Sequence, residues 1–586
     1  MCSIIAYMGK MTAAPILVKC LKRMEYRGYD SVGLATISKK RILIKKGVGK
    51  VDDVNKLLHL EKLNGSVGIG HTRWATHGGV TYKNAHPHQD CKNEIAIVHN
   101  GIIENYNELK KSLITKGHKF KSETDSEVIA HMIGEFLNKN NNIKKAVINV
   151  ANKLKGTYAF VAILNDGTLV GARYDEPLIV GVAKDGYYIS SDVLGFIEYT
   201  DQAIFLDNNE FVIIDSESLT IYDANGSKVK KRITRIAWEL ADVDKGKFAH
   251  HTLKEINEQK HMISKAFSIR QSDFQEFVNV LASSKKILIT GSGSSYHAAL
   301  IAKQLLSKFC KLQCETILSS EFQYSSNVLT KDSVLLAISQ SGETADLLQI
   351  VKTVKESKAK ILSLVNVTTS SLARASNLFL GINCGPEIGV AATKSFTAQL
   401  SLIYRITNEL SIPTMRININ EIGKFVNNIL NSSKNIVKIA EQIKHIGNIY
   451  VLGRGLHFPI ALEAALKLKE LVYVHAEGIP AGELKHGPLA LMDENTIVIM
   501  LNPQDETYED TLSNVYEIKA RNAIIVGVSN VNNNKYDEWI KIPKAKDLVY
   551  PLLEVIPLQL LAYYTAVKRE SNPDYPRNLA KSVTVK

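Results

Sequence analysis

The chain has 586 residues, which at roughly 150 residues per domain predicts three or four domains and excludes a fold with a single hydrophobic core. Hydrophobic residues make up 45% and charged residues 22%, as in globular proteins, so disordered and fibrous classes are excluded. The 72 basic residues outnumber the 59 acidic ones and give a net charge of +13. Because the lysines are scattered, we interpret this charge as a basic surface and expect neither nucleic acid nor a membrane as partner.

The cysteines form no CxxC pair and show no Cys/His spacing typical of zinc ligands, so we expect neither a disulfide nor a metal site. They are Cys2, Cys20, Cys91, Cys310, Cys314 and Cys384. The first ten residues lack a basic segment followed by an apolar stretch, and we therefore expect no secretion signal and a cytoplasmic protein.

The N-terminal part alternates short β-branched runs with turns, and helical patterns interrupt it at about 14–24 and 126–137. Strands are predicted at 94–98, 158–164 and 211–214. This mixture predicts an α+β sandwich with helices outside the sheets. The chain becomes charged and loses periodicity between 228 and 246, so we place a domain boundary near residue 240.

Beyond this boundary, strands are followed by glycine or serine turns and then by helices, as at 286–310 and 333–355. Repeated βα units predict a parallel sheet covered by helices. A second copy begins at about Asn448, because Gly453 lies 162 residues after Gly291. The longest apolar segment, 549–567, contains Glu554 and two prolines, and we interpret it as a buried helix rather than a membrane span.

Cys2 is a candidate nucleophile, because removal of Met1 would leave a cysteine with a free α-amine. The amine titrates at about 7.7–8.0 and a thiol at about 8.5, so the amine can accept the thiol proton near neutral pH. Considered alone, Cys2 is better explained as a small residue that simply follows the initiator.

Other polar segments follow predicted strands and would complete such a site. Arg73, Trp74 and His77 form a plausible wall for a small zwitterionic substrate. Asn100 and Gly101 follow a strand and can converge on a developing oxyanion. Asp125 precedes a predicted helix, where it would either cap the helix or receive a substrate ammonium group.

These segments, together with 21–33, resemble the N-terminal-nucleophile glutamine amidotransferases, and specifically the glutaminase half of the glutamine:fructose-6-phosphate aminotransferase family. The resemblance implies an αββα sandwich in which Cys2 attacks the glutamine amide. It also implies an oxyanion hole of Asn100 and Gly101, an α-carboxylate site at Arg73, an α-ammonium site at Asp125, and a glutamine pocket lined by Trp74, which gates ammonia, and His77. The family usually has glycine after the nucleophile, whereas this chain has Ser3, so we expect a negative φ or a shifted turn there.

The serine-rich turn 339–344 lies between a strand and a helix, where hydroxyl and N–H groups favour a phosphate. The turn at 291–296 is not a dinucleotide fingerprint, because its sixth residue is Tyr296. Both turns, with 387–394, resemble the sugar isomerase (SIS) domains of the same family. By this resemblance a ketose phosphate is held by Ser295, Ser339, Gln340, Ser341, Thr344, Val390, Ala392 and Ala580. Ala392 stands where the family commonly has serine, so one hydroxyl contact is replaced or lost.

Glu463, Lys467 and Glu470 share one face of a predicted helix at 461–470. Taken alone they indicate a solvated ladder of ion pairs. The resemblance instead implies that Glu470 moves a proton between C1 and C2 of the sugar with help from Lys467. It further implies that His486 opens the sugar ring from the partner subunit, and that Lys581 forms a Schiff base with the ketose carbonyl.

Together with these boundaries, the resemblance implies a glutaminase domain at 2–240, SIS domains at 241–430 and 431–577, and a tail at 578–586 that completes the sugar site. The expected reaction converts glutamine and fructose 6-phosphate to glutamate and glucosamine 6-phosphate in a homodimer, without a cofactor. Two alternatives are a different cysteine-first amidotransferase, which would need pyrophosphate-binding or ATP-binding loops, and a sugar-phosphate-sensing regulator, which would need a DNA-binding segment. Neither feature is found in the sequence.

Overall fold

The computed structural model describes residues 2–238, 240–265, 269–325, 329–411 and 417–584. The chain forms two compact units. The first contains the chain up to Asp242 together with the segment that begins at Ala580, and the second spans Val243–Leu579.

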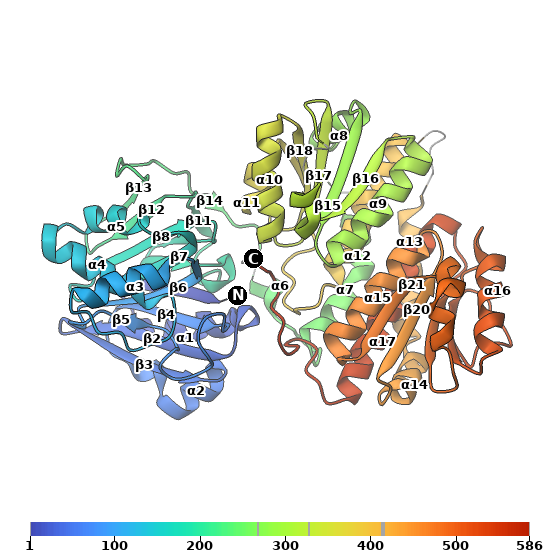
Figure 1. Ribbon diagram of the computed structural model, residues 1–586, viewed down its shortest axis with the longest axis horizontal. Coiled ribbons are helices and arrows are strands. Elements are labelled where there is room, and N and C mark those ends of the chain that lie inside the picture. Colours follow the sequence, from blue (N-terminus) through green and yellow to red (C-terminus); the bar gives the residue numbers. More distant parts are fainter. Residues whose placement is uncertain (1, 239, 266–268, 326–328, 412–416, 585–586) are drawn as a thin grey trace. The chain divides into compact units, whose positions relative to one another are not determined.

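The first unit contains two antiparallel sheets (Figure 1). The larger sheet has the strand order β14 (Thr234–Arg235), β11 (Gln202–Phe205), β9 (Ile179–Ala183), β10 (Gly186–Ser190), β1 (Ser3–Gly9), β4 (Val67–Arg73), β2 (Ser31–Ser38) and β3 (Arg41–Val48). The smaller sheet has the order β13 (Leu219–Tyr222), β12 (Phe211–Ile214), β8 (Leu169–Tyr174), β7 (Gly156–Leu164), β6 (Ile95–Ile103) and β5 (His88–Gln89).

Side-chain alternation along the strands builds four layers in this unit. On β1, Ile5 and Tyr7 pack against the outer helices, whereas Ile4 and Ala6 pack between the two sheets. On β6, Ile97 faces the helices on the other side. The helices are α1 (Ala13–Arg23) and α2 (Val51–Leu58) on the larger sheet, and α3 (Tyr106–Thr115), α4 (Glu127–Asn140) and α5 (Ile143–Ala151) on the smaller sheet. The expected αββα sandwich is confirmed.

The second unit contains two parallel sheets of five strands. One has the order β16 (Cys314–Leu318), β15 (Lys286–Gly291), β17 (Ser333–Ser339), β18 (Lys360–Val365) and β19 (Leu378–Gly381). The other has the order β21 (His475–Pro480), β20 (Asn448–Gly453), β22 (Ile497–Leu501), β23 (Ile524–Ser529) and β24 (Glu538–Lys541). In both sheets the second strand along the chain is the edge strand next to the first, and the third, fourth and fifth strands follow on the other side of the first. The expected duplication of a parallel α/β domain is therefore confirmed.

Buried side chains on helices from both copies form one hydrophobic core in the second unit. From Leu240 onward the helices are α6 (Leu240–Val243), α7 (His251–Lys265), α8 (Gln271–Ala282), α9 (Ser294–Cys310), α10 (Ala345–Ser357), α11 (Ser371–Ala375), α12 (Lys394–Leu410), α13 (Ile419–Asn431), α14 (Lys434–Ile443), α15 (His457–Val472), α16 (Tyr508–Lys519) and α17 (Tyr550–Lys568). Among the described residues, one helical segment, Asp547–Lys568, is long and apolar enough to cross a membrane, but 89% of its most apolar window is buried inside the protein. The buried helix expected at this segment is confirmed.

Candidate active site

Strand register places Cys2 beside the end of β4. Ser3 pairs with Thr72 across the antiparallel β1–β4 ladder, so the residue before Ser3 lies next to the residues after Thr72. The backbone N–H of Trp74 donates a hydrogen bond to the Cys2 sulfur at 3.2 Å, and the thiol lies 3.5 Å from the Trp74 carbonyl oxygen. The sheet itself therefore positions the sulfur.

Asn100 reaches Cys2 from β6 in the other sheet. Its Nδ2 donates to the Cys2 carbonyl oxygen at 3.0 Å, while its Oδ1 lies 3.2 Å from Nε2 of His71. The same His71 nitrogen lies 3.0 Å from the carbonyl oxygen of His99. Because both neighbours are acceptors, His71 Nε2 carries the proton, and burial lowers the pKa of His71 to about 3, so the ring is neutral.

Gly101 follows Asn100 in a conformation that favours glycine. Its φ is +110°, and an added Cβ would lie 2.1 Å from the carbonyl oxygen of Thr157 on β7. A side chain at this position would displace β6 from β7, and Asn100 with it. The structure thus brings Cys2, Asn100 and Gly101 together.

Arg73 and Asp125 are both buried near Cys2. The Arg73 guanidinium donates to the carbonyl oxygens of His77, Gly78 and Gly79, and so holds the following loop. Burial lowers the pKa of Arg73, although the charges of Cys2, Asp30 and Asp125 oppose this shift. Arg73, Asp125 and Cys2 are therefore close enough for their charges to affect one another.

Asp125 does not cap the helix that follows it. Its Oδ2 accepts from the backbone N–H of Ile103 at 2.7 Å, and the N-cap position of α4 is Ser126, whose side chain makes no cap hydrogen bond. Of the two roles considered from the sequence, capping is not observed.

Trp74 and His77 are half-buried beside aromatic side chains. The Trp74 ring meets Tyr29 edge-on at 5.7 Å, and the His77 ring meets Tyr106 edge-on at 5.6 Å. Nδ1 of His77 is buried and has no hydrogen-bond partner among the described residues. An unpartnered buried nitrogen is what a site for a polar ligand provides.

The surroundings of Cys2 do not favour a thiolate. Burial raises the pKa of the thiol, and the Trp74 N–H and Arg73 only partly offset this. Ser3 begins β1 with a φ outside the left-handed region, which is the first of the two arrangements expected for it. Its hydroxyl donates to the Met24 carbonyl oxygen at 2.8 Å. Reactivity of the thiol therefore requires a base.

Sequence reasoning assigned no role to His71 or Arg27. Arg27 Nε donates to the Cys2 carbonyl oxygen at 3.3 Å, and its guanidinium pairs with Asp192 at 3.0 Å. Arg27 lies within the segment 21–33 that carried the resemblance, which was the available signal, and the structure shows that it is buried. His71 likewise begins the segment 71–78 that carries the resemblance, but its role depends on strand pairing, which a single sequence does not show.

In the second unit, the turns after β15 and β17 lie at the carboxyl ends of neighbouring parallel strands, where ligands bind in α/β sheets. The Ser339 hydroxyl accepts from the Gly342 N–H at 2.9 Å, and that of Ser341 accepts from the Glu343 N–H at 3.2 Å. Thr344 is the N-cap residue of α10, and its side chain makes no cap hydrogen bond. Gln340, Ser341 and Thr344 are half-buried.

Ser295 and the loop before α12 complete this cluster. The Ser295 hydroxyl accepts from Nε2 of Gln399 at 3.0 Å. Glu387 holds the loop by accepting from the backbone N–H groups of Thr393 and Ser395, both at 3.0 Å. Val390 is buried, and Ala392 is half-buried. Thr393 Oγ1 and Gln399 Oε1 are buried without partners among the described residues.

Glu463, Lys467 and Glu470 share one face of α15, but this face is not solvated. Lys467 and Glu463 are 0% exposed. Lys467 Nζ lies 2.5 Å from Glu470 and 3.5 Å from Glu463. Burial favours neutral Lys467, but the two carboxylates outweigh it and raise its pKa. The reading of a solvated ladder is wrong, because α9 and α17 cover this helix.

Glu463 also ties α15 to the first copy of the α/β domain. Its carboxylate accepts from the Ser294 hydroxyl at 2.8 Å and contacts His297 Nδ1 at 2.7 Å, and both partners lie on α9. His486 is exposed on the short helix η7 (Ala481–His486). Ala580 and Lys581 are half-buried and belong to the first unit.

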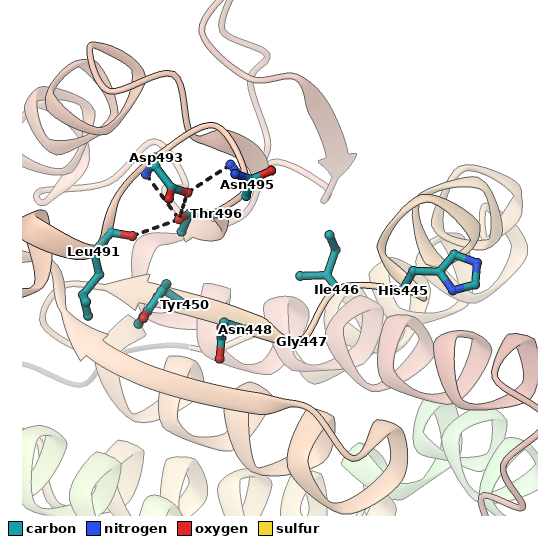
Figure 2. Close-up of a pocket in the computed structure, with 9 residues that line it drawn as sticks. All are labelled: His445, Ile446, Gly447, Asn448, Tyr450, Leu491, Asp493, Asn495 and Thr496. Atoms are coloured by element: carbon teal, nitrogen blue, oxygen red, sulfur yellow. Dashed lines mark hydrogen bonds between the residues drawn. The ribbon is translucent and has the colours of Figure 1, made fainter.

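A pocket of about 410 Å³ lies at the amino ends of the strands in the second parallel sheet (Figure 2). It is lined by His445, Ile446, Gly447, Asn448, Tyr450, Leu491, Asp493, Asn495 and Thr496. These residues lie around the amino ends of β20 and β22, away from the carboxyl ends where ligands of such sheets bind. None of the residues expected to bind substrate lines this pocket.

Family models match both units. A glutamine amidotransferase domain matches residues 71–197, and an SIS domain matches residues 280–408 and 442–569. The chain is 42% identical to glutamine–fructose-6-phosphate aminotransferase [isomerizing] of Methanothermobacter thermautotrophicus and 43% identical to that of Pyrococcus horikoshii, over 100% of both chains in each case.

Solved structures match the second unit. The C-terminal domain of glucosamine-fructose-6-phosphate aminotransferase from Francisella tularensis has a TM-score of 0.51 and 34% identity, and the match covers 56% of this chain and 99% of that one. Identity over the full length and the matching domain content lead to one assignment. The chain belongs to the glutamine–fructose-6-phosphate aminotransferase (isomerizing) family.

Proposed function

We propose that the protein transfers the amide nitrogen of glutamine to fructose 6-phosphate, giving glucosamine 6-phosphate and glutamate. Membership of the family supports this assignment, as does the presence of a nucleophile cluster in one unit and a phosphate-type turn in the other. The observation that carries it is the side-chain amide of Asn100, which is oriented by His71 and directed at the backbone of Cys2.

In the glutaminase reaction, the α-amine of processed Cys2 takes the thiol proton, and the sulfur attacks the amide carbon of glutamine. Nδ2 of Asn100 and the N–H of Gly101 stabilise the oxyanion. The resulting α-ammonium gives this proton to the amide nitrogen, ammonia leaves as the thioester forms, and water then hydrolyses the thioester to glutamate and the free thiol. The raised pKa of the Cys2 thiol supports the need for the α-amine as base.

Glutamine itself is held by charges at its two ends. Arg73 binds the α-carboxylate and Asp125 binds the α-ammonium group. Trp74 and His77 line the pocket, and Trp74 gates the released ammonia. Burial of Arg73 and Asp125 strengthens these contacts, because water screens them less.

In the sugar reaction, the phosphate binds at the turn 339–344 with Ser295, and Val390, Ala392 and Ala580 contact the sugar. The hydroxyl of Thr393, beside Ala392, has no hydrogen-bond partner in the part of the chain that the structure describes, and this supports a polar ligand at this loop. Glu470 moves the proton between C1 and C2, and Lys467, kept charged by its carboxylate neighbours, stabilises the oxygen that gains charge.

The remaining steps involve the tail and a second copy of the chain. Lys581 forms a Schiff base with the ketose carbonyl. His486 opens the sugar ring from the second copy in a cytoplasmic homodimer, and its exposure supports this role. The domains are 2–240, 241–430, 431–577 and the tail 578–586.

Separate assays of the two half-reactions test the proposal. We expect Cys2→Ala to abolish glutamine-dependent synthesis while fructose 6-phosphate is still isomerised, and Glu470→Gln to abolish isomerisation while glutamine is still hydrolysed. Cys310→Ala, a half-buried thiol of the second unit, is the matched control and should keep both activities. Equal loss of both activities in Cys2→Ala would contradict the two-site assignment.

A further inference from the structure

A cysteine and two histidines that the proposed function does not use lie together in the first unit. Cys91 is in the turn after β5, His118 is in the loop after α3, and His131 is on α4. Their ligand atoms all lie within 4.8 Å of one another. Cys91 is exposed, His118 is half-buried and His131 is buried, so the group opens to solvent on one side.

The spacing of the three atoms is that of metal ligands. Sγ of Cys91 lies 3.6 Å from Nδ1 of His131 and 3.9 Å from Nδ1 of His118, and the two nitrogens are 3.2 Å apart. Bonds of about 2.3 Å from zinc to sulfur and about 2.05 Å to nitrogen give tetrahedral edges of about 3.6 Å and about 3.3 Å. The side chains already occupy three corners of such a tetrahedron.

Each histidine also has a carboxylate behind it. Nε2 of His131 lies 3.5 Å from Glu127, and Nε2 of His118 lies 3.4 Å from Glu135. A carboxylate at Nε2 holds the proton there and turns the lone pair of Nδ1 toward the group, as in carboxylate–histidine–metal sites. This pairing on both histidines is independent of the spacing of the ligand atoms.

Two further contacts surround the three ligand atoms, one at the Cys91 sulfur and one at the His131 ring. The backbone N–H of Lys119 points at Sγ of Cys91 at 3.2 Å, which stabilises negative charge on the sulfur. The ring of Phe120 packs on that of His131 at 4.3 Å and keeps water from one side.

We propose that Cys91, His118 and His131 bind one zinc ion, or a similar divalent transition metal, with water as the fourth ligand. The donor set suits zinc, because thiolate and imidazole are its preferred ligands. The sequence predicted no metal because the three residues are separated by 27 and 13 positions and form no short motif. The fold alone brings them together.

The metal would tie three separate segments to one another. Glu127, behind His131, also accepts from the backbone N–H groups of Lys121 and Ser122 at 2.8 and 2.7 Å. A metal on His131 therefore also steadies the loop that leads to α4. We assign it a structural role, so binding should stabilise the first unit against unfolding.

Metal titration of the full chain tests the site. After reduction and treatment with chelator, we expect one equivalent of Co²⁺ to give the visible absorption of a tetrahedral ion and a thiolate-to-metal charge-transfer band. Zinc should displace it. Cys91→Ser and His118→Gln should each lower zinc affinity at least about 100-fold, and Glu135→Gln about 10- to 100-fold. Cys2→Ala and Cys310→Ser should bind zinc as the unaltered chain does.

Thermal unfolding gives a second measurement. Saturating zinc should raise the unfolding temperature of the unaltered chain and of Cys310→Ser, but not that of Cys91→Ser. Because Cys91 is exposed, its replacement by serine should leave the metal-free fold intact, which circular dichroism checks. The proposal is overturned if no thiolate-to-metal band forms, if Cys91→Ser binds zinc unchanged, or if Cys2→Ala is the variant that loses binding.

Discussion

Nε2 of His71 lies 3.2 Å from Oδ1 of Asn100 and thereby determines which way the Asn100 amide faces. The oxygen of the amide is turned toward the imidazole, so its nitrogen is directed at Cys2. His71 can perform this task because burial keeps the ring neutral, with its proton on Nε2. The orientation of the oxyanion donor thus depends on a residue that does not contact the substrate in the proposed reaction.

We expect Asn100→Ala to lower kcat for glutamine hydrolysis about 100- to 1000-fold, because one oxyanion donor is lost. His71→Gln should lower it less and leave KM for glutamine nearly unchanged, since an amide donor can still reach Oδ1. Steady-state glutaminase assays measure both. A rise in KM without a fall in kcat for His71→Gln would contradict a positioning role.

Gly101→Ala should disrupt the junction of β6 and β7. A Cβ at Gly101 meets the Thr157 carbonyl oxygen at 2.1 Å, in addition to about 1–3 kcal/mol of backbone strain at positive φ. Gly117→Ala is the matched control, because Gly117 also has positive φ, +91°, but has nothing within 4 Å of an added Cβ. Urea unfolding should show a larger loss of stability for Gly101→Ala, together with loss of glutamine hydrolysis. Equal losses in the two variants would exclude the clash as the cause.

Lys467→Met should be strongly destabilising, because it leaves Glu463 buried without its cationic neighbour. Breaking a buried ion pair from one side costs about 3–5 kcal/mol. Lys469→Met, at an exposed site on the same helix, should cost little. Chemical unfolding followed by the fluorescence of Trp539, in a chain whose Trp74 and Trp238 are replaced by phenylalanine, measures the difference. The double variant Lys467→Met with Glu463→Gln should recover part of the loss, and no recovery would show that charge is not the cause.

Local patterns were sufficient to predict an α+β sandwich in the first unit and parallel α/β sheets in the second. The β-branched runs separated by turns, the two helical patterns and the repeated strand–turn–helix units can be recognised in a single sequence because they are set by neighbours along the chain, whereas the αββα order of the first unit was implied by the family resemblance. Contacts between distant segments could not be predicted in this way. Ser294 and His297 meet Glu463 across 169 and 166 positions, and this contact is what makes the α15 face buried rather than solvated. The roles of His71 and Arg27 depend on strand pairing in the same way.

Acid pH should destabilise the first unit through its buried histidines. Burial lowers the pKa of His71, His86, His88 and His99, so these rings are neutral when folded but take up protons when unfolded below about pH 6.5. Stability therefore falls as pH falls from about 6.5, by about 1.4 kcal/mol per pH unit for each proton taken up. Hydrogen exchange of the β6 peptide measures this. His99→Gln should reduce the slope by up to one proton, while His59→Gln, at an exposed site, should leave it unchanged.

His457 gives the second unit the opposite dependence. Its Nδ1 lies 2.8 Å from Glu554 and its Nε2 lies 2.7 Å from Asp505, so both ring nitrogens donate to carboxylates. Burial alone would lower the pKa of His457, but the two carboxylates outweigh it and raise it to about 10.

Because this folded-state pKa exceeds the unfolded value of about 6.5, the imidazolium stabilises the fold fully below about pH 6.5 and progressively less as pH rises toward 10. We expect unfolding followed by Trp539 fluorescence, in the chain whose Trp74 and Trp238 are replaced by phenylalanine, to show this loss between pH 7 and 10. The double variant His457→Gln with Glu554→Gln should be less stable at pH 6.5, and its deficit should shrink toward pH 10. His445→Gln, at an exposed site, should follow the unaltered chain. A deficit that stays constant over this range would mean that His457 is neutral in the folded protein.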